Sequence, residues 1–219
     1  MKRLLIFDFD GTLIDSAQDI ADSVNELLHT QGIDPLPMDM IKANIGEGLH
    51  RLVQNFFPGI ADTEPKFKEL ESTFIQIYER RMLTTTKLFP GVLDFFRQNK
   101  DDIALVTNKN IEHAQILMKE LGLMEFSWSS IFGANSLPEK KPHPMPLLEA
   151  MSRSGTDVDN AVMIGDGTPD LIAAKMAGVR SIAVSYGYTP MALLKMHGPS
   201  AIMHRFEDLS SLLQMLEGG

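Results

Sequence analysis

The 219-residue sequence contains no cysteine. This absence excludes disulfide bridges, zinc sites built from thiolates, and enzymes that use a cysteine nucleophile. It is compatible with a reducing compartment, and we expect the protein to be cytoplasmic.

Long hydrophobic runs are also absent, and none approaches the length that a transmembrane helix needs. The first ten residues, MKRLLIFDFD, begin like a signal peptide. Their apolar run stops at Asp8, however, and is too short for one. We therefore expect no association with a membrane.

Basic residues are in the minority, with 20 lysines and arginines against 29 aspartates and glutamates, which gives a net charge of −9. This balance argues against nonspecific binding to nucleic acid or to an anionic surface. It does not exclude a small anionic ligand, because one cation or metal ion can dominate the charge of a pocket.

Short apolar runs recur along the chain. They are LLIF at 4–7, IALV at 103–106, AVMI at 161–164 and IAV at 182–184. Continuous apolar runs of this length are typical of strands buried on both faces of a parallel sheet. Apolar residues at helical spacing, such as Ile111, Ala114 and Met118, lie between them. Strands that alternate with helices predict an α/β fold.

The interval between the first two runs is unusually long. About ninety residues separate Phe7 from Ile103, and their apolar residues follow helical spacing throughout. A single crossover between parallel strands needs only one helix. We therefore predict a helical insertion at 16–84, with an α/β core made of 1–15 and 85–219. The alternative is that these helices belong to the core of one domain.

Polar residues follow three of the apolar runs. Asp8 ends the first, Thr107 and Asn108 end the second, and Asp166 follows the third after a glycine. Ligands of open parallel sheets bind beyond the carboxyl ends of the strands, so these side chains predict a site. The alternative for Thr107 and Asn108 is a helix N-cap.

A fourth element is EKKPHPMP at 139–146. Lys141 precedes Pro142, and a residue before proline is driven into an extended conformation. The prolines would therefore hold the Lys141 ammonium in a fixed place. The alternative is that Lys140 and Lys141 are a solvated pair in a loop.

Together these residues predict a phosphate site. Asp8 can attack phosphorus, and Asp10 can give a proton to the leaving oxygen and later take one from water. Mg²⁺ held by Asp8 and Asp166 would reduce the repulsion between Asp8 and a phosphate dianion. Thr107 and Lys141 would bind phosphoryl oxygens as charge develops on them.

The same segments resemble the four motifs of the haloacid dehalogenase superfamily, in their usual order: DFDGT, VTN, KKPHP and GDGTPD. The resemblance implies a doubly wound, Rossmann-like core, a phospho-aspartyl intermediate and Mg²⁺, with a backbone carbonyl of Asp10 on the metal. In the family's dehalogenases the position of Asp10 is not acidic, so Asp10 favours phosphoryl chemistry.

The candidate site residues follow from these motifs. They are Asp8, Asp10, Thr107 and Lys141 for catalysis, Thr107, Asn108 and Lys141 for phosphate, and Asp8, Asp10, Asp166 and Asp170 for the metal. GDGTPD lacks the serine that often follows the aspartate, and Thr168 and Pro169 resemble an N-cap and a first helical position. Whether Asp170 binds the metal directly or through water stays open.

The insertion resembles the small helical cap of the superfamily's first subclass, and segments such as NIGEGLHRLV resemble phosphoglycolate phosphatases. We therefore expect a Mg²⁺-dependent phosphatase for a small phosphorylated metabolite, with 2-phosphoglycolate as the first candidate. One alternative is a phosphomutase that resembles β-phosphoglucomutase. Another is a non-enzymatic phospho-aspartate switch. The oligomeric state stays open.

Substrate selection would fall to the cap, because the four motifs touch only phosphate and metal. The candidate segment is IGEGLHR at 45–51. Gly46 and Gly48 would let the backbone approach a ligand, and Arg51 could hold a carboxylate by two parallel hydrogen bonds. The alternative is that the glycines only shape a loop and Arg51 is a solvated surface charge.

Overall fold

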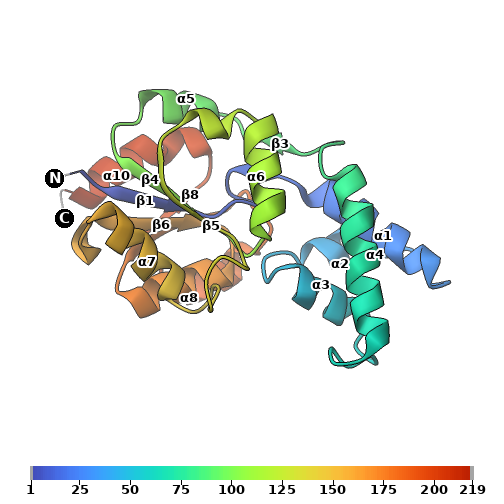
Figure 1. Ribbon diagram of the computed structural model, residues 1–219. Coiled ribbons are helices and arrows are strands. Elements are labelled where there is room, and N and C mark those ends of the chain that lie inside the picture. Colours follow the sequence, from blue (N-terminus) through green and yellow to red (C-terminus); the bar gives the residue numbers. More distant parts are fainter. Residues whose placement is uncertain (1, 218–219) are drawn as a thin grey trace.

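The computed structural model describes residues 2–217 and contains a six-stranded parallel sheet with helices on both faces (Figure 1). From edge to edge the strands are β5 (Trp128–Phe132), β4 (Asp102–Val106), β1 (Leu4–Phe7), β6 (Ala161–Gly165), β7 (Arg180–Val184) and β8 (Ala201–Met203). The predicted α/β, doubly wound fold is confirmed.

The central strands are apolar because both of their faces are buried. In β1, Leu5 and Phe7 belong to one apolar cluster and Leu4 and Ile6 to the other. The first cluster is covered by α5 (Val92–Gln98), α6 (Ile111–Glu120) and α10 (Leu209–Glu217). The opposite face is covered by α7 (Met145–Ser154), α8 (Thr168–Ala177) and α9 (Met191–Met196).

The strands that the sequence predicted are β1, β4, β6 and β7, which occupy the middle of the sheet. The two that it did not predict, β5 and β8, are the edge strands. β5 mixes Ser129 and Ser130 with apolar residues, and its side chains alternate between exposed and buried positions. An edge strand is covered less completely, which accounts for the serines of β5. β8 is apolar but has only three residues.

Four helices lie between β1 and α5 in the sequence. They are α1 (Ala17–Thr30), α2 (Met38–Lys42), α3 (Leu49–Phe56) and α4 (Pro65–Arg81). They gather beyond one end of the sheet, and the antiparallel pair β2 (Ile14–Asp15) and β3 (Lys87–Leu88) joins them to it (Figure 1). We call α1–α4 the cap helices. Their buried apolar side chains are continuous with those of the sheet, and the division at 16–84 stays a prediction.

Two helices begin beside the candidate site. α3 begins at Leu49, directly after Gly48. α8 begins at Thr168 with Gly167 as its N-cap, so the predicted N-cap at Thr168 was wrong by one residue. The carboxylate of Asp170 accepts the N–H of Gly167 at 2.9 Å, and this bond serves as the cap.

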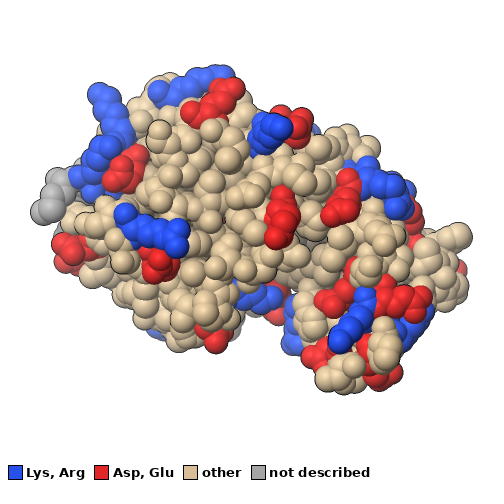
Figure 2. Space-filling model, in the orientation of Figure 1, with Lys and Arg blue, Asp and Glu red and all other residues tan. Residues whose placement is uncertain are grey.

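Surface charge is mixed on the face drawn in Figure 2, where described acidic and basic side chains are interspersed. Among the described residues, Arg80 forms an ion pair with Glu26, and Arg153 forms one with Glu149. Within residues 2–217, no helix combines the length and the apolar character that crossing a bilayer requires.

A buried carboxylate links the first turn of α1 to the segment that follows α4. Asp19, in the first turn of α1, is 1% exposed. It accepts hydrogen bonds from the main-chain N–H and the hydroxyl of both Thr85 and Thr86, at 2.6 to 3.1 Å. Burial alone would raise the pKa of Asp19, but these hydrogen bonds lower it below 3.8.

We expect Asp19→Asn to lower the free energy of unfolding at pH 7 by about 1–3 kcal/mol, because an amide cannot accept all four donors. A depressed pKa stabilises the folded state above the unfolded-state value and loses this effect as the pH falls through the folded-state pKa. The difference between the variant and the parent should therefore shrink below pH 4, approximately the unfolded-state value.

Urea unfolding at pH 7 and at acidic pH measures this difference. Asp22→Asn, on the same helix but paired only with the exposed Gln18, is the matched control and should change little. A loss of stability in Asp19→Asn that is equal at both pH values would contradict the ionic role of Asp19.

Candidate active site

The turn after β1 delivers two aspartates to the carboxyl edge of the sheet. Asp8 continues the strand far enough to donate its N–H to the carbonyl of Ile164 at 2.9 Å. Gly11 then turns the chain with a φ of 80°. A Cβ at Gly11 would lie 2.3 Å from a carboxylate oxygen of Asp166, so only glycine permits this close approach.

Three carboxylates converge beyond this edge. Asp8 follows β1, Asp166 follows β6, and Asp170 lies in the first turn of α8. All three are buried, and an oxygen from each lies within 4.8 Å of the others. The structure therefore brings together three of the four predicted metal ligands.

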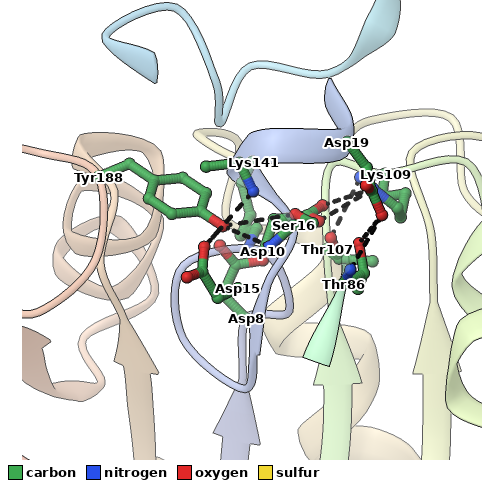
Figure 3. Close-up of polar contacts among 11 residues, drawn as sticks. Asp8, Asp10, Asp15, Ser16, Asp19, Thr86, Thr107, Lys109, Lys141 and Tyr188 are labelled. Atoms are coloured by element: carbon green, nitrogen blue, oxygen red, sulfur yellow. Dashed lines mark hydrogen bonds and ion pairs between the residues drawn. The ribbon is translucent and has the colours of Figure 1, made fainter. Parts of the chain in front are cut away.

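Lys141 is the cation of this cluster. Its ammonium lies 2.8 Å from Asp8 Oδ1 (Figure 3). The same ammonium lies 2.6 Å from Asp170 Oδ1. Burial would lower the pKa of Lys141, but the charges of Asp170 and Asp8 raise it above its usual value. By contrast, Lys140 turns to the cap helices, where its ammonium donates to the carbonyl of Glu47 at 2.7 Å.

One lysine does not balance three buried acids. Burial raises the pKa of Asp8 from 3.8 to about 7, with a further contribution from the charge of Asp170 and against the effect of Lys141. Burial and the charges of Asp8 and Asp170 also raise the pKa of Asp166 well above 3.8. The cluster therefore favours a further positive charge.

The donor set fits Mg²⁺, which prefers carboxylate oxygens and water. Asp166 is held for such a role, because Tyr188 N–H donates to its Oδ2 at 2.7 Å and Thr12 Oγ1 donates to its Oδ1 at 3.2 Å. Asp8 and Asp166 would be ligands, and Asp170 would lie at the same ion.

The second motif lies beside the cluster. Thr107 and Asn108 follow β4 and are buried. Asn108 Nδ2 donates to the carbonyls of Gly46 and Lys141, at 3.0 and 2.9 Å. It therefore connects the cap segment, residues 45–51, to the third motif. Its Oδ1 is buried without a hydrogen-bond partner.

Asp10 does not join the metal cluster by its carboxylate. Lys109 Nζ lies 2.9 Å from both of its oxygens, and Ser16 Oγ donates to Oδ1 (Figure 3). The hydroxyl of Tyr188 accepts the N–H of Ser16 at 2.8 Å and supports this arrangement. Lys109 and Tyr188 were not predicted from the sequence.

Their positions explain why. Lys109 directly follows the second motif, and its lysine could equally have been a solvated loop residue, because its partner Asp10 lies 99 positions away. The available signal was its place at the carboxyl end of a buried strand, next to Thr107 and Asn108. Tyr188 follows β7 in the same way, beyond the run IAV.

A cavity of about 60 Å³ lies between this edge of the sheet and the cap helices. Asp8, Asp10 and Thr107 line it from the sheet side, and Gly46 and Gly48 line it from the cap side. A Cβ at Gly48, whose φ is 90°, would meet the carbonyl oxygen of Asn108 at 2.7 Å. The close packing of the cap segment therefore depends on this glycine.

Arg51 does not line the cavity. Its guanidinium is exposed, forms an ion pair with Glu47 at 3.3 Å, and donates to Gln54 at 2.8 Å. In this arrangement Arg51 is a surface charge, which was the alternative to a role in substrate selection.

Comparison with known proteins agrees with this geometry. The chain is 38% identical to a phosphoglycolate phosphatase of Neisseria meningitidis, over 88% of this chain and 84% of that protein, and 34% identical to one of Psychrobacter arcticus, over 98% and 96%. A crystal structure of a predicted phosphoglycolate phosphatase from Haemophilus somnus 129PT superposes with a TM-score of 0.88 at 29% identity, over 97% of this chain and 98% of that one. Residues 5–184 match the haloacid dehalogenase-like hydrolase family model, and the chain belongs to that family.

Proposed function

We propose that the protein is a Mg²⁺-dependent phosphatase for a small phosphomonoester, with 2-phosphoglycolate as the first candidate. The observation that carries the proposal is the buried cluster of Asp8, Asp166 and Asp170, in which Lys141 pairs with Asp8 and Asp170 and Asp8 lines a small cavity. The names of the relatives support the choice of substrate.

In the proposed reaction, a carboxylate oxygen of Asp8 forms a bond to phosphorus while the bond from phosphorus to the ester oxygen breaks. Asp10 donates a proton to that leaving oxygen. Asp10 then accepts a proton from the water that attacks the phospho-aspartate, which releases inorganic phosphate and restores Asp8. Each residue thus returns to its starting state.

Other groups of the chain would hold the phosphoryl oxygens. Lys141 is fixed beside Asp8 by its ion pairs, and Thr107 is buried at the neighbouring strand end. Charge moves onto the phosphoryl and leaving oxygens during the reaction, and donors already in place stabilise it without reorganisation. A bound Mg²⁺ would supply charge neutralisation between Asp8 and the phosphate.

The alternatives remain distinguishable. A phosphomutase must hold a sugar in two orientations, and the cap side of the cavity, whose described lining is largely apolar, offers no clear set of polar groups for this. A phospho-aspartate switch would keep its phosphoryl group for many seconds, whereas a phosphatase hydrolyses it at once. Phosphate release from a simple monoester would contradict both alternatives.

The direct test is phosphate release from a panel of phosphorylated metabolites, with and without Mg²⁺ and with EDTA. We expect hydrolysis of small monoesters that depends on Mg²⁺ and is abolished by EDTA. Mg²⁺ should also raise the melting temperature of the protein, because a ligand of the folded state stabilises it, and Asp166→Asn should remove this rise. Hydrolysis that is unaffected by EDTA would contradict the metal assignment.

Substitutions of Asp8 and of Asp10 should impair different steps of the reaction. Asp8→Asn removes the nucleophile, so no phospho-enzyme should form. Asp10→Asn should slow turnover by about 10²–10⁴-fold for a poor leaving group, and less for p-nitrophenyl phosphate, whose leaving oxygen hardly needs a proton. Trapping of labelled phospho-enzyme and steady-state kinetics measure the two effects. A normal level of phospho-enzyme in Asp8→Asn would refute its role.

The two neighbouring lysines provide a matched comparison. Lys141→Ala should lower the rate by about 100-fold or more, because it removes a buried donor at the phosphoryl oxygens. Lys140→Ala should cost little, because its ammonium contacts only the carbonyl of Glu47 in the described structure. Kinetic assays of both variants measure this difference. The reverse result would show that the third motif had been assigned one residue out of register.

A further inference from the structure

The side of the cavity that faces the cap helices would receive the leaving group, and its lining differs from that of the side that faces the sheet. The lining toward the cap is largely apolar and includes Ile20, Ile45, Leu49, Leu52, Phe74 and the ring of Tyr78, together with Asn44, Gly46 and Gly48. Among the described residues that line the cavity, Lys109 is the only lysine or arginine. A charged leaving group could therefore find a full positive charge here at Lys109.

An ion pair fixes the Lys109 ammonium, which can still donate a further hydrogen bond. Its side chain is 7% exposed, and its ammonium pairs with Asp10 at 2.9 Å to each oxygen. The charge of Asp10 raises the pKa of Lys109 against the effect of burial, which would lower it. An ammonium has three N–H groups, of which Asp10 uses at most two.

Tyr78 of α4 lies next to this ammonium. The centre of its ring is 4.8 Å from Lys109 Nζ. Tyr78 is only 3% exposed, and its hydroxyl interacts with the Lys109 ammonium but has no acceptor for its own proton in the described structure. Burial raises the pKa of this hydroxyl to about 12, so it is neutral and can donate. A buried hydroxyl proton without an acceptor is costly, and such groups in native proteins require an explanation.

We propose that the ammonium of Lys109 and the hydroxyl of Tyr78 together bind the carboxylate of the substrate. The enzyme would then select phosphate esters of 2-hydroxy acids, in which the carboxylate is attached to the carbon that carries the ester oxygen. This inference rests on the proposed phosphatase function, and it assigns to Lys109 the role that the sequence suggested for Arg51.

The distances favour this class of substrate. Asp10 must touch the leaving oxygen to protonate it, and Lys109 Nζ is 2.9 Å from the Asp10 carboxylate. In the ester of a 2-hydroxy acid, two single bonds separate the leaving oxygen from the carboxylate carbon, a span of about 2.5 Å. The carboxylate therefore remains within reach of a cation that contacts Asp10. An additional methylene would move it farther along, toward the apolar wall.

The same arrangement opposes other anions. A carboxylate in this cavity lies close to Asp10, whose negative charge repels it unless a cation stands between them. Lys109 is placed between Asp10 and the ring of Tyr78, so it can serve both carboxylates. An anion that could not reach Lys109 would be left unpaired against apolar side chains, at a large cost in free energy.

The test compares two substrates of nearly equal shape, 2-phosphoglycolate and glycolamide phosphate, in which a neutral amide replaces the carboxylate. In the parent enzyme the ratio of their kcat/KM values should favour 2-phosphoglycolate. Lys109→Met should lower this ratio by about 30-fold or more, because it leaves a desolvated carboxylate unpaired. Lys119→Met, which changes an exposed lysine at the end of α6, should leave the ratio unchanged.

The ratio separates substrate binding from positioning of Asp10. If Lys109 only held Asp10, Lys109→Met would slow both substrates equally and the inference would be refuted. A parent enzyme that hydrolyses both esters equally well would also refute it, although the phosphatase function would stand. A parent that releases phosphate from neither ester, nor from any monoester of the panel, would refute the proposed function itself.

Tyr78→Phe provides a second test that does not depend on the stability of Lys109→Met. The variant removes an oxygen that interacts with the Lys109 ammonium but has no acceptor for its own proton in the described structure, so the melting temperature should change little. The preference for 2-phosphoglycolate should decrease by about 5- to 10-fold, the effect of one hydrogen bond to a charged group. The phosphate ester of 3-hydroxypropionate has one more methylene than 2-phosphoglycolate and should be a poorer substrate. An unchanged preference in Tyr78→Phe would exclude the hydroxyl from the binding site.

Discussion

The burial of three carboxylates around one lysine is the constraint on which the rest of the site depends. Buried acids of like charge repel one another and lose hydration, which is why the pKa of Asp8 and that of Asp166 are raised. Each acid is held at the end of a different element, and Lys141 offsets part of the repulsion by pairing with Asp8 and Asp170. A site so short of positive charge is suited to a divalent cation.

The parallel sheet explains why residues so far apart in sequence meet. Every strand of a parallel sheet ends at the same edge, so the polar residue that follows each central strand arrives at one place. The order β4-β1-β6 puts the strand of Asp8 between those of Thr107 and Asp166. The cap helices close this edge, and their contacts with it include the hydrogen bond from Asn108 to the carbonyl of Gly46.

The features that could be predicted from the sequence are those that depend on residues close together in the chain. The central strands had continuous apolar runs because both faces are covered, and Lys141 could be distinguished from Lys140 by the proline that follows it. The edge strand β5 was missed because partial exposure permits polar residues, and β8 offered only a run of three apolar residues. Lys109 was not assigned a role because its partners, Asp10 and Tyr78, are distant in sequence and meet it only in the folded chain.

Two aspartates separated by one residue are kept chemically distinct because each receives its own lysine. Asp8 shares Lys141 with Asp170, in a crowded cluster that raises the pKa of Asp8 to about 7. Asp10 faces the other way and has Lys109 to itself. Environments that separate the properties of two neighbouring acids allow them to take different roles in one reaction. The turn at Gly11 and the two lysines therefore give the two aspartates of one short acidic segment different surroundings, and the proposed function assigns them different roles.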